Sequence, residues 1–172
     1  MQCNGDHAVF CIGTWRSNDW AICAFWVDDE TGIGSSHQLQ CIVDMFCQKY
    51  GISGEGDMQW TLGIGVSHNY KTHTISLSQE QYIDNLLEWF GLQNTTTVTT
   101  PLPPGTILTK EQCLTTSKEL QDMVGNNYQE LIGSIQYIAL TSQPDISFTV
   151  SKLVQFLNNP SCIHLEATHC VL

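Results

Sequence analysis

Short apolar runs and longer apolar periodicities alternate along the chain. In the first third, the runs His7–Gly13 and Trp20–Val27 are short and apolar and are separated by the turn-rich residues 14–19. This pattern predicts two β-strands. The apolar positions of residues 39–50 then recur at helical spacing, and Gly51 follows them where a helix commonly ends in glycine. The first third therefore predicts two strands followed by one helix.

The middle third shows the same order of elements. Met58–Val66 and His73–Leu77 flank a polar segment, which predicts a hairpin with a longer loop. An apolar stripe over Tyr82–Phe90 then predicts a helix that Gly91 ends.

The last third is predominantly helical in pattern. Residues 94–105 are rich in Thr and Pro, too interrupted for a helix, and are typical of an extended linker. Beyond them, apolar residues recur at helical spacing, and Pro144 and Pro160 suit first helical positions. We therefore predict an α+β fold with a sheet and two helices over residues 1–93, a linker over 94–105 and a helical region over 106–172, which the chain end truncates.

Composition and charge exclude several classes of protein. Hydrophobic residues make up 42% of the 172 residues, as in a globular domain rather than a disordered tail. The longest strongly apolar run, Ala21–Val27, is far shorter than the roughly 18–20 residues of a membrane span. Residues 1–7 lack the features of a signal peptide, so we expect an intracellular protein that is neither secreted nor membrane-bound.

The chain is acidic throughout. Six Lys and Arg residues against 17 Asp and Glu residues give a net charge of −11. Because phosphate binding depends on Lys and Arg displacing counterions, we expect the isolated chain to bind nucleic acid poorly. The eight cysteines contain no C-x-x-C pair and are interpreted as reduced thiols.

The adjacent carboxylates of Asp28 and Asp29 are the strongest candidate for chemistry. They follow a strongly apolar strand, so a tight turn would project both into one small space. Two like charges there repel one another unless a hard cation such as Mg²⁺ lies between them. The alternative is an ordinary solvated hairpin turn, in which Asp is common.

A second cluster of possible ligands lies near the C-terminus. Cys162, His164, His169 and Cys170 are residue types that bind zinc. If they lie on one helix, His164 and His169 are five residues apart and Cys162 and Cys170 are eight apart, so the four side chains do not converge on one point. The favoured interpretation is therefore that they are helix residues that bind no metal.

Several motifs resemble one family of enzymes, in order and in spacing. Phe25–Asp29 resembles the Y-V-D-D box of reverse transcriptases. The remaining motifs are similar to those of copia-type retrotransposon enzymes: Trp60–Ile64 (F-L-G-I), Ile75–Gln79 with Tyr82 and Ile83 (I-x-L-S-Q-x-x-Y-I), Tyr128–Tyr137 (Y-R-x-L-V-G-S-L-x-Y), Pro144–Phe148 (R-P-D-I-x-F), and Pro160 with His164 and Ala167 (P-x-x-x-H-x-x-A). The chain thus resembles the C-terminal part of the polymerase domain of a copia-type (Ty/copia) LTR-retrotransposon reverse transcriptase, that is, the end of the palm plus the thumb.

The resemblance implies a function, partners and roles for individual residues. The family's activity is RNA-directed DNA polymerisation, in which palm carboxylates bind two Mg²⁺ ions. It implies that Asp28 and Asp29 are the catalytic and metal-binding residues, that Trp26 is the aromatic residue beside them, and that four residues form a primer-grip-like hairpin: Trp60, Leu62, Gly63 and Ile64. The implied partners are an RNA/DNA primer–template, a dNTP and the rest of the Pol polyprotein, in the cytoplasm, a virus-like particle or the nucleus.

The chain also departs from the family pattern. The family's third metal-binding carboxylate and its fingers lie upstream of the segment that this chain matches, and Gln143 stands where the family has Arg. We therefore expect the isolated chain to be inactive and to bind Mg²⁺ only weakly. The alternative is a non-catalytic remnant that acts as a protein-interaction module or has no function.

Overall fold

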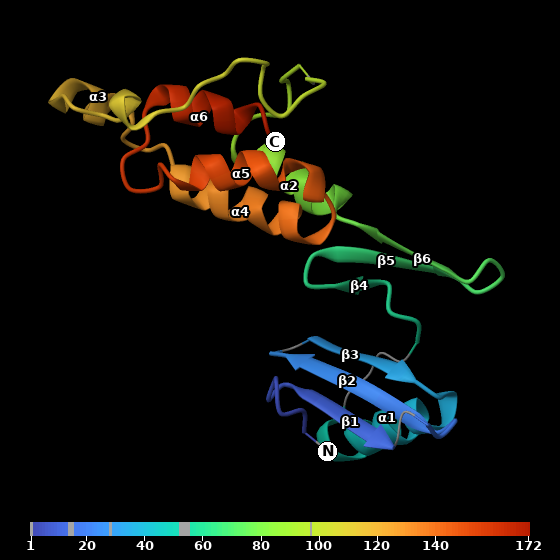
Figure 1. Cartoon of the computed structure of the whole chain (residues 1–172). Helices are drawn as coiled ribbons and strands as arrows, with labels where there is room; N and C mark the ends of the chain where they lie inside the picture. Colours follow the sequence, from blue (N-terminus) through green and yellow to red (C-terminus); the bar gives the residue numbers. More distant parts are fainter. Residues whose placement is uncertain (1, 14–15, 28, 52–55, 97) are drawn as a thin grey trace. The chain divides into compact units, whose positions relative to one another are not determined.

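The computed structural model describes residues 2–13, 16–27, 29–51, 56–96 and 98–172. In chain order its elements are β1 (Val9–Gly13), β2 (Trp20–Trp26), β3 (Asp29–Gly34), α1 (Ser36–Tyr50), β4 (Trp60–Thr61), β5 (Ile64–Asn69), β6 (Thr74–Ser78), α2 (Glu80–Trp89), the 3₁₀ turn η1 (Lys110–Gln112), α3 (Ser117–Asp122), α4 (Tyr128–Thr141), the 3₁₀ turn η2 (Pro144–Ile146), α5 (Ser147–Val154) and α6 (Cys162–His169) (Figure 1). The described residues form two antiparallel sheets and six helices, which confirms the predicted α+β class. Among the described residues, no helix has the length and apolar character needed to cross a membrane.

The chain divides into two compact units, Met1–Leu77 and Ser78–Leu172. This division differs from the predicted one, which places residues 78–93 with the first part of the chain. Leu86 of α2 is 3% exposed and packs in one cluster with Leu131 and Ile135 of α4. Because its apolar stripe is buried there, α2 belongs to the second unit. The predicted linker at 94–105 contains no helix or strand among its described residues, which leave out residue 97.

In the first unit, β2 is the central strand of the sheet β1-β2-β3. Its side chains alternate in burial, with Ala21 and Cys23 buried on the face that α1 covers (Figure 1). Helix α1 starts after Ser35, whose hydroxyl accepts from the Gln38 N–H, and ends as predicted at Gly51, which adopts the left-handed conformation.

Strand β3 is absent from the sequence-based prediction. It contains two glycines and a single apolar residue, Ile33, which is 62% exposed. Gly34 lies so close to β2 that an added Cβ would stand 2.3 Å from the Trp20 carbonyl oxygen. Pairing with β2, rather than local strand propensity, therefore creates this strand.

In the second unit, helices α2, α4, α5 and α6 enclose the core. Two adjoining clusters of buried side chains contain Leu131, Ile132, Ile135, Ile138 and Leu153, each no more than 2% exposed. The Tyr128 hydroxyl donates to the Leu153 carbonyl at 2.9 Å and so joins α4 to α5 inside this core.

Candidate functional site

Asp29 of the predicted metal-binding pair is the first residue of β3. It pairs with Trp26, the last residue of β2. Asp28 itself lies outside the described residues. Trp26 is 65% exposed and Asp29 is also exposed, so the hairpin presents these side chains to solvent.

Val27 has an unusual backbone conformation for its residue type. Its φ is +51° and its side chain is 93% exposed. A β-branched residue in the left-handed region is strained, at a cost of roughly 1–3 kcal/mol. No burial of the Val27 side chain offsets this strain, so the strand pairing on either side must impose the turn.

The predicted primer-grip-like residues form a second tight hairpin. Trp60 pairs with Gly65 and Thr61 with Ile64, which leaves Leu62 and Gly63 as the loop. Both loop residues have positive φ, +49° at Leu62 and +78° at Gly63, as in a type I′ turn. Glycine adopts this conformation without strain, whereas Leu62 does not.

A hydrogen bond joins the start of β3 to the Leu62–Gly63 turn. The Leu62 N–H donates to Asp29 Oδ2 at 3.1 Å, across 33 residues of sequence. A carboxylate can accept several hydrogen bonds, so this contact does not exhaust the Asp29 oxygens. The Asp29 carboxylate therefore faces the turn of the predicted primer-grip-like hairpin and accepts a hydrogen bond from it.

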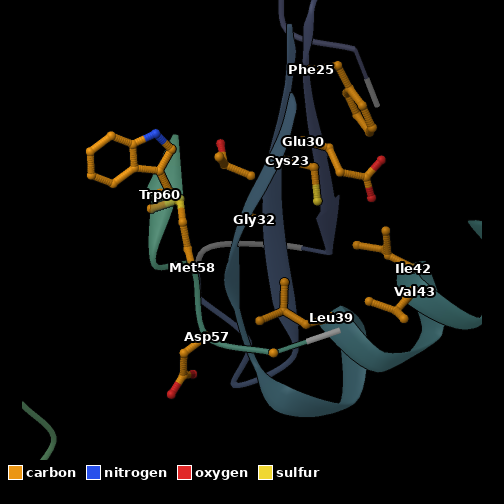
Figure 2. A pocket seen from close by; sticks show the side chains of 12 residues that line it. Cys23, Phe25, Glu30, Gly32, Leu39, Ile42, Val43, Asp57, Met58 and Trp60 are labelled. Carbon is orange, nitrogen blue, oxygen red and sulfur yellow. The ribbon is translucent and has the colours of Figure 1, made fainter. Parts of the chain in front are cut away.

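A cavity of about 370 Å³ lies beside these hairpins (Figure 2). Trp60 and Met58 form one side of it, and Cys23, Phe25 and Glu30 lie across from them, with apolar residues of α1 below. Among the described residues that line it, two carry carboxylates, Glu30 and Asp57, and none is Lys or Arg. Such a wall repels phosphate groups, so the cavity does not suit the triphosphate of a nucleotide.

The pKa values of two side chains are raised, one that lines the cavity and one that is hydrogen-bonded to a lining residue. Burial raises the pKa of the Cys23 thiol, and the nearby Glu30 carboxylate raises it further, so this thiol stays protonated and unreactive at neutral pH. Asp57 accepts a hydrogen bond from the Tyr70 hydroxyl, which raises the pKa of Tyr70. Sequence analysis missed Asp57 because it precedes β4 and carries no motif of its own; Glu30 directly follows the Asp pair and could have been included.

The C-terminal Cys and His residues are separated in the structure. Cys162 is exposed and its thiol points to the Met123 sulfur at 3.8 Å, whereas His164 is fully buried and stacks on Phe156. His164 Nδ1 accepts from the Ser161 N–H at 3.0 Å as part of a capping box at the start of α6. Among the described residues, which do not include Asp28, no three His, Cys, Asp or Glu side chains come together as metal ligands.

Comparison with known proteins relates the chain to transposons. It is 31% identical over 156 residues to the retrovirus-related Pol polyprotein from transposon TNT 1-94 of Nicotiana tabacum, and 31% identical over 148 residues to that from transposon RE1 of Arabidopsis thaliana. The chain is homologous to retrotransposon Pol polyproteins. This confirms the retrotransposon Pol polyprotein relationship that the copia-type motifs indicate.

The homology covers nearly all of this chain but little of its plant relatives. The matches include 90% and 86% of the chain, but only 12% and 10% of the two plant polyproteins. A protein of Saccharomyces cerevisiae with the name "Putative transposon Ty5-1 protein" is 30% identical over 169 residues, and the chain covers 52% of it. No protein-family model matches the chain. No solved structure matches it either.

Proposed function

We propose that the chain is a segment of a retrotransposon RNA-directed DNA polymerase, with Asp28 and Asp29 as its metal-binding residues and the Leu62–Gly63 hairpin as its primer grip. The hydrogen bond from the Leu62 N–H to Asp29 carries this proposal. It joins the two segments that the copia-type motifs assign to one reaction, although 33 residues separate them in sequence. We would not expect an ordinary solvated turn to form a hydrogen bond with that hairpin.

The donor set fits Mg²⁺. Mg²⁺ prefers carboxylate oxygens and is commonly bound by one or two carboxylates together with substrate phosphates. Asp29 is exposed at the strand end next to Asp28, and its carboxylate retains lone pairs beyond the one that Leu62 uses. When bound, Mg²⁺ would bring a primer 3′-hydroxyl onto the α-phosphate of a dNTP and neutralise charge on the leaving pyrophosphate.

The chain's own residues have positioning roles in this proposal. Asp29 orients the Leu62–Gly63 turn, whose backbone would lie along the primer. Trp26 pairs with Asp29 at the end of β2, and its indole is exposed. Together these contacts would place the metal and the primer end close to one another.

The charge of −11 limits what the chain does on its own. Two carboxylates bind Mg²⁺ weakly, in the millimolar range at best, and gain affinity when a nucleotide triphosphate adds its oxygens. An acidic surface repels a primer–template at physiological salt. We therefore expect weak metal–nucleotide binding at the turn, and neither primer–template binding nor polymerisation by the chain alone.

Paramagnetic NMR of the ¹⁵N-labelled chain tests this proposal. Mn²⁺ added with a dNTP should broaden the amide signals of Val27, Asp29, Leu62 and Gly63 first, with a midpoint in the millimolar range. Asp28→Asn should remove this selective broadening. Asp84→Asn, at an exposed carboxylate of α2, is the matched control and should leave it unchanged.

Three outcomes would contradict the proposal. The first is selective broadening at another acidic cluster with none at the two hairpins. The second is micromolar Mn²⁺ affinity that survives Asp28→Asn. The third is saturable binding of a primer–template at physiological salt with the steep salt dependence of phosphate contacts, which would refute the stated role of charge.

A further inference from the structure

Three side chains at the start of α1 form a hydrogen-bonded series. His37 Nδ1 lies 3.3 Å from Asp19 Oδ1, and His37 Nε2 lies 3.9 Å from Cys41 Sγ. His37 and Cys41 are four residues apart on α1 and so share one helix face, while Asp19 comes from the connection before β2. A carboxylate, an imidazole and a thiol in this order are the orienting group, base and nucleophile of cysteine chemistry.

Further hydrogen bonds hold the carboxylate in place. Asp19 accepts from Gln38 Nε2 at 2.8 Å and from the Ser35 hydroxyl at 2.9 Å. These bonds, that of Gln38 first, keep the pKa of Asp19 below its usual value, so Asp19 is ionised at neutral pH. An ionised carboxylate only accepts, so it favours the proton on His37 Nδ1 and leaves Nε2 as an acceptor facing the thiol.

We propose that Cys41 is a reactive thiol, activated by His37 and Asp19, that undergoes exchange with low-molecular-weight disulfides. Cys41 is exposed, and the His37 side chain is 73% exposed, so a small disulfide in solution can reach both. Asp44 lies three residues after Cys41 and adds a second carboxylate near this helix face. Since Asp19 and Asp44 are both anionic, neither stabilises a thiolate, and activation depends on proton transfer to the imidazole.

During the exchange, His37 accepts one proton and later returns it, while one S–S bond replaces another. The proton of Cys41 Sγ moves to His37 Nε2, and the sulfur electron pair attacks one sulfur of the incoming disulfide. A new bond forms between Sγ and that sulfur as the old S–S bond breaks. The other sulfur leaves with the bonding pair and takes the proton from His37, so the products are a mixed disulfide at Cys41 and a free thiol.

The open position of the series favours exchange over hydrolysis. Cys41 and His37 line neither the 370 Å³ cavity nor the 480 Å³ groove between the sheet and α1. Hydrolysis of an ester or amide needs a pocket that orients the substrate and donors for an oxyanion, whereas disulfide exchange needs only access to the thiolate. The substrate class is therefore a small soluble disulfide.

The chain contains its own control thiol. Cys162 is also exposed, but its sulfur faces the Met123 thioether at 3.8 Å rather than a base. Oxidised glutathione is added to the reduced full-length chain at pH 7, and the mixed disulfide at each cysteine is quantified over time by peptide mass spectrometry. General-base assistance should make Cys41 react at least about tenfold faster than Cys162.

Substitution of the base separates activation from simple exposure. His37→Gln should lower the rate at Cys41 to within about twofold of Cys162 and leave Cys162 unchanged. His7→Gln, at an exposed histidine outside the series, is the matched control and should change neither rate. Circular dichroism of each variant should show that α1 remains folded, which is expected because the His37 side chain is mostly exposed.

Equal rates at Cys41 and Cys162 would overturn the proposal. So would an unchanged Cys41 rate in His37→Gln, because the thiol would then react through exposure alone. Asp19→Asn adds a graded test: loss of the orienting carboxylate should lower the Cys41 rate by a smaller factor than His37→Gln, and an equal or larger loss with intact α1 would contradict the assigned roles.

Discussion

The two units bury their apolar side chains to very different extents. Among the described residues, the first unit contains three buried hydrophobic residues (Ala21, Cys23 and Ile42), whereas the second contains fourteen. The first unit also contains the 370 Å³ cavity and a 480 Å³ apolar groove between its sheet and α1. The second unit also has surface pockets, of about 430 and 210 Å³, but its larger buried core can stabilise it, whereas the first unit has a small core and carries the candidate site.

This difference has a physical cause. In the second unit the helices pack on several sides of α4, so one helix contributes many buried side chains to a common core. In the first unit one helix covers one face of a small sheet, and side chains such as Phe10 and Ile12 of β1 stay 38% and 37% exposed. Regions with few buried apolar contacts open at lower free energy. We expect the hairpins of the candidate site to open before the helical unit.

The largest effect should come from the core of the second unit. Ile135 is 0% exposed, so Ile135→Ala should lower the free energy of unfolding by about 2–5 kcal/mol, measured by urea denaturation. Leu140→Ala, on the same helix but 79% exposed, should change it by less than about 0.5 kcal/mol. Ile42→Ala in the first unit should cost less than Ile135→Ala, because its surroundings are already open; an equal cost would refute the contrast between the units.

A smaller effect should follow from pH in the second unit. Burial lowers the pKa of His164 and also that of His169, where Glu166 partly opposes it. A histidine of the unfolded chain has a pKa of about 6.5. Because the pKa values in the folded chain are lower, the unfolded state binds more protons than the folded state just below that pH. The stabilisation is therefore fully present above about pH 6.5 and is lost as the pH falls towards the lower, folded pKa values.

His164→Gln isolates this contribution. Gln at the third helical position retains the capping box with Ser161 but does not titrate. The free energy of unfolding should then depend less on pH between about 5 and 7.5, with the remaining slope due to His169. His7→Gln is the control at an exposed histidine. If the pH dependence of the free energy of unfolding is unchanged in His164→Gln, the buried His164 does not contribute to it.

The smallest effect should come from the strained turn of the first unit. Asn tolerates the left-handed conformation better than Val, and the Val27 side chain is 93% exposed, so little packing is lost. Val27→Asn should raise the free energy of unfolding by about 0.5–1 kcal/mol in thermal or urea denaturation. Val124→Asn, at an exposed residue of the second unit whose φ is not positive, should be neutral within about 0.5 kcal/mol. A loss of stability in Val27→Asn would show that the turn is not strained.

Sequence patterns alone predicted the elements whose signals are local. Strands β1 and β2 and helices α1 and α2 lie where apolar runs, helical periodicity and Gly51 or Gly91 indicate them. The single strand predicted over Met58–Val66 is wrong, because the tight turn at Leu62 and Gly63 divides it into β4 and β5. The order of short motifs also predicted the retrotransposon relationship, because residue identity at fixed spacing is retained in sequence. The roles of Asp28, Asp29 and the primer-grip-like residues stay predictions from that resemblance.

Only the tertiary structure decided which segments meet. Strand β3 exists because it pairs with β2, and α2 joins the second unit because Leu86 packs on α4; neither partner is marked in the segment itself. The contact of Asp29 with the Leu62 N–H, and the alignment of Asp19 with His37 and Cys41, join residues 33 and 18 positions apart. Periodicity reports which face of one element is apolar, whereas contacts between elements depend on how several faces fit together, and that information is distributed over the whole chain.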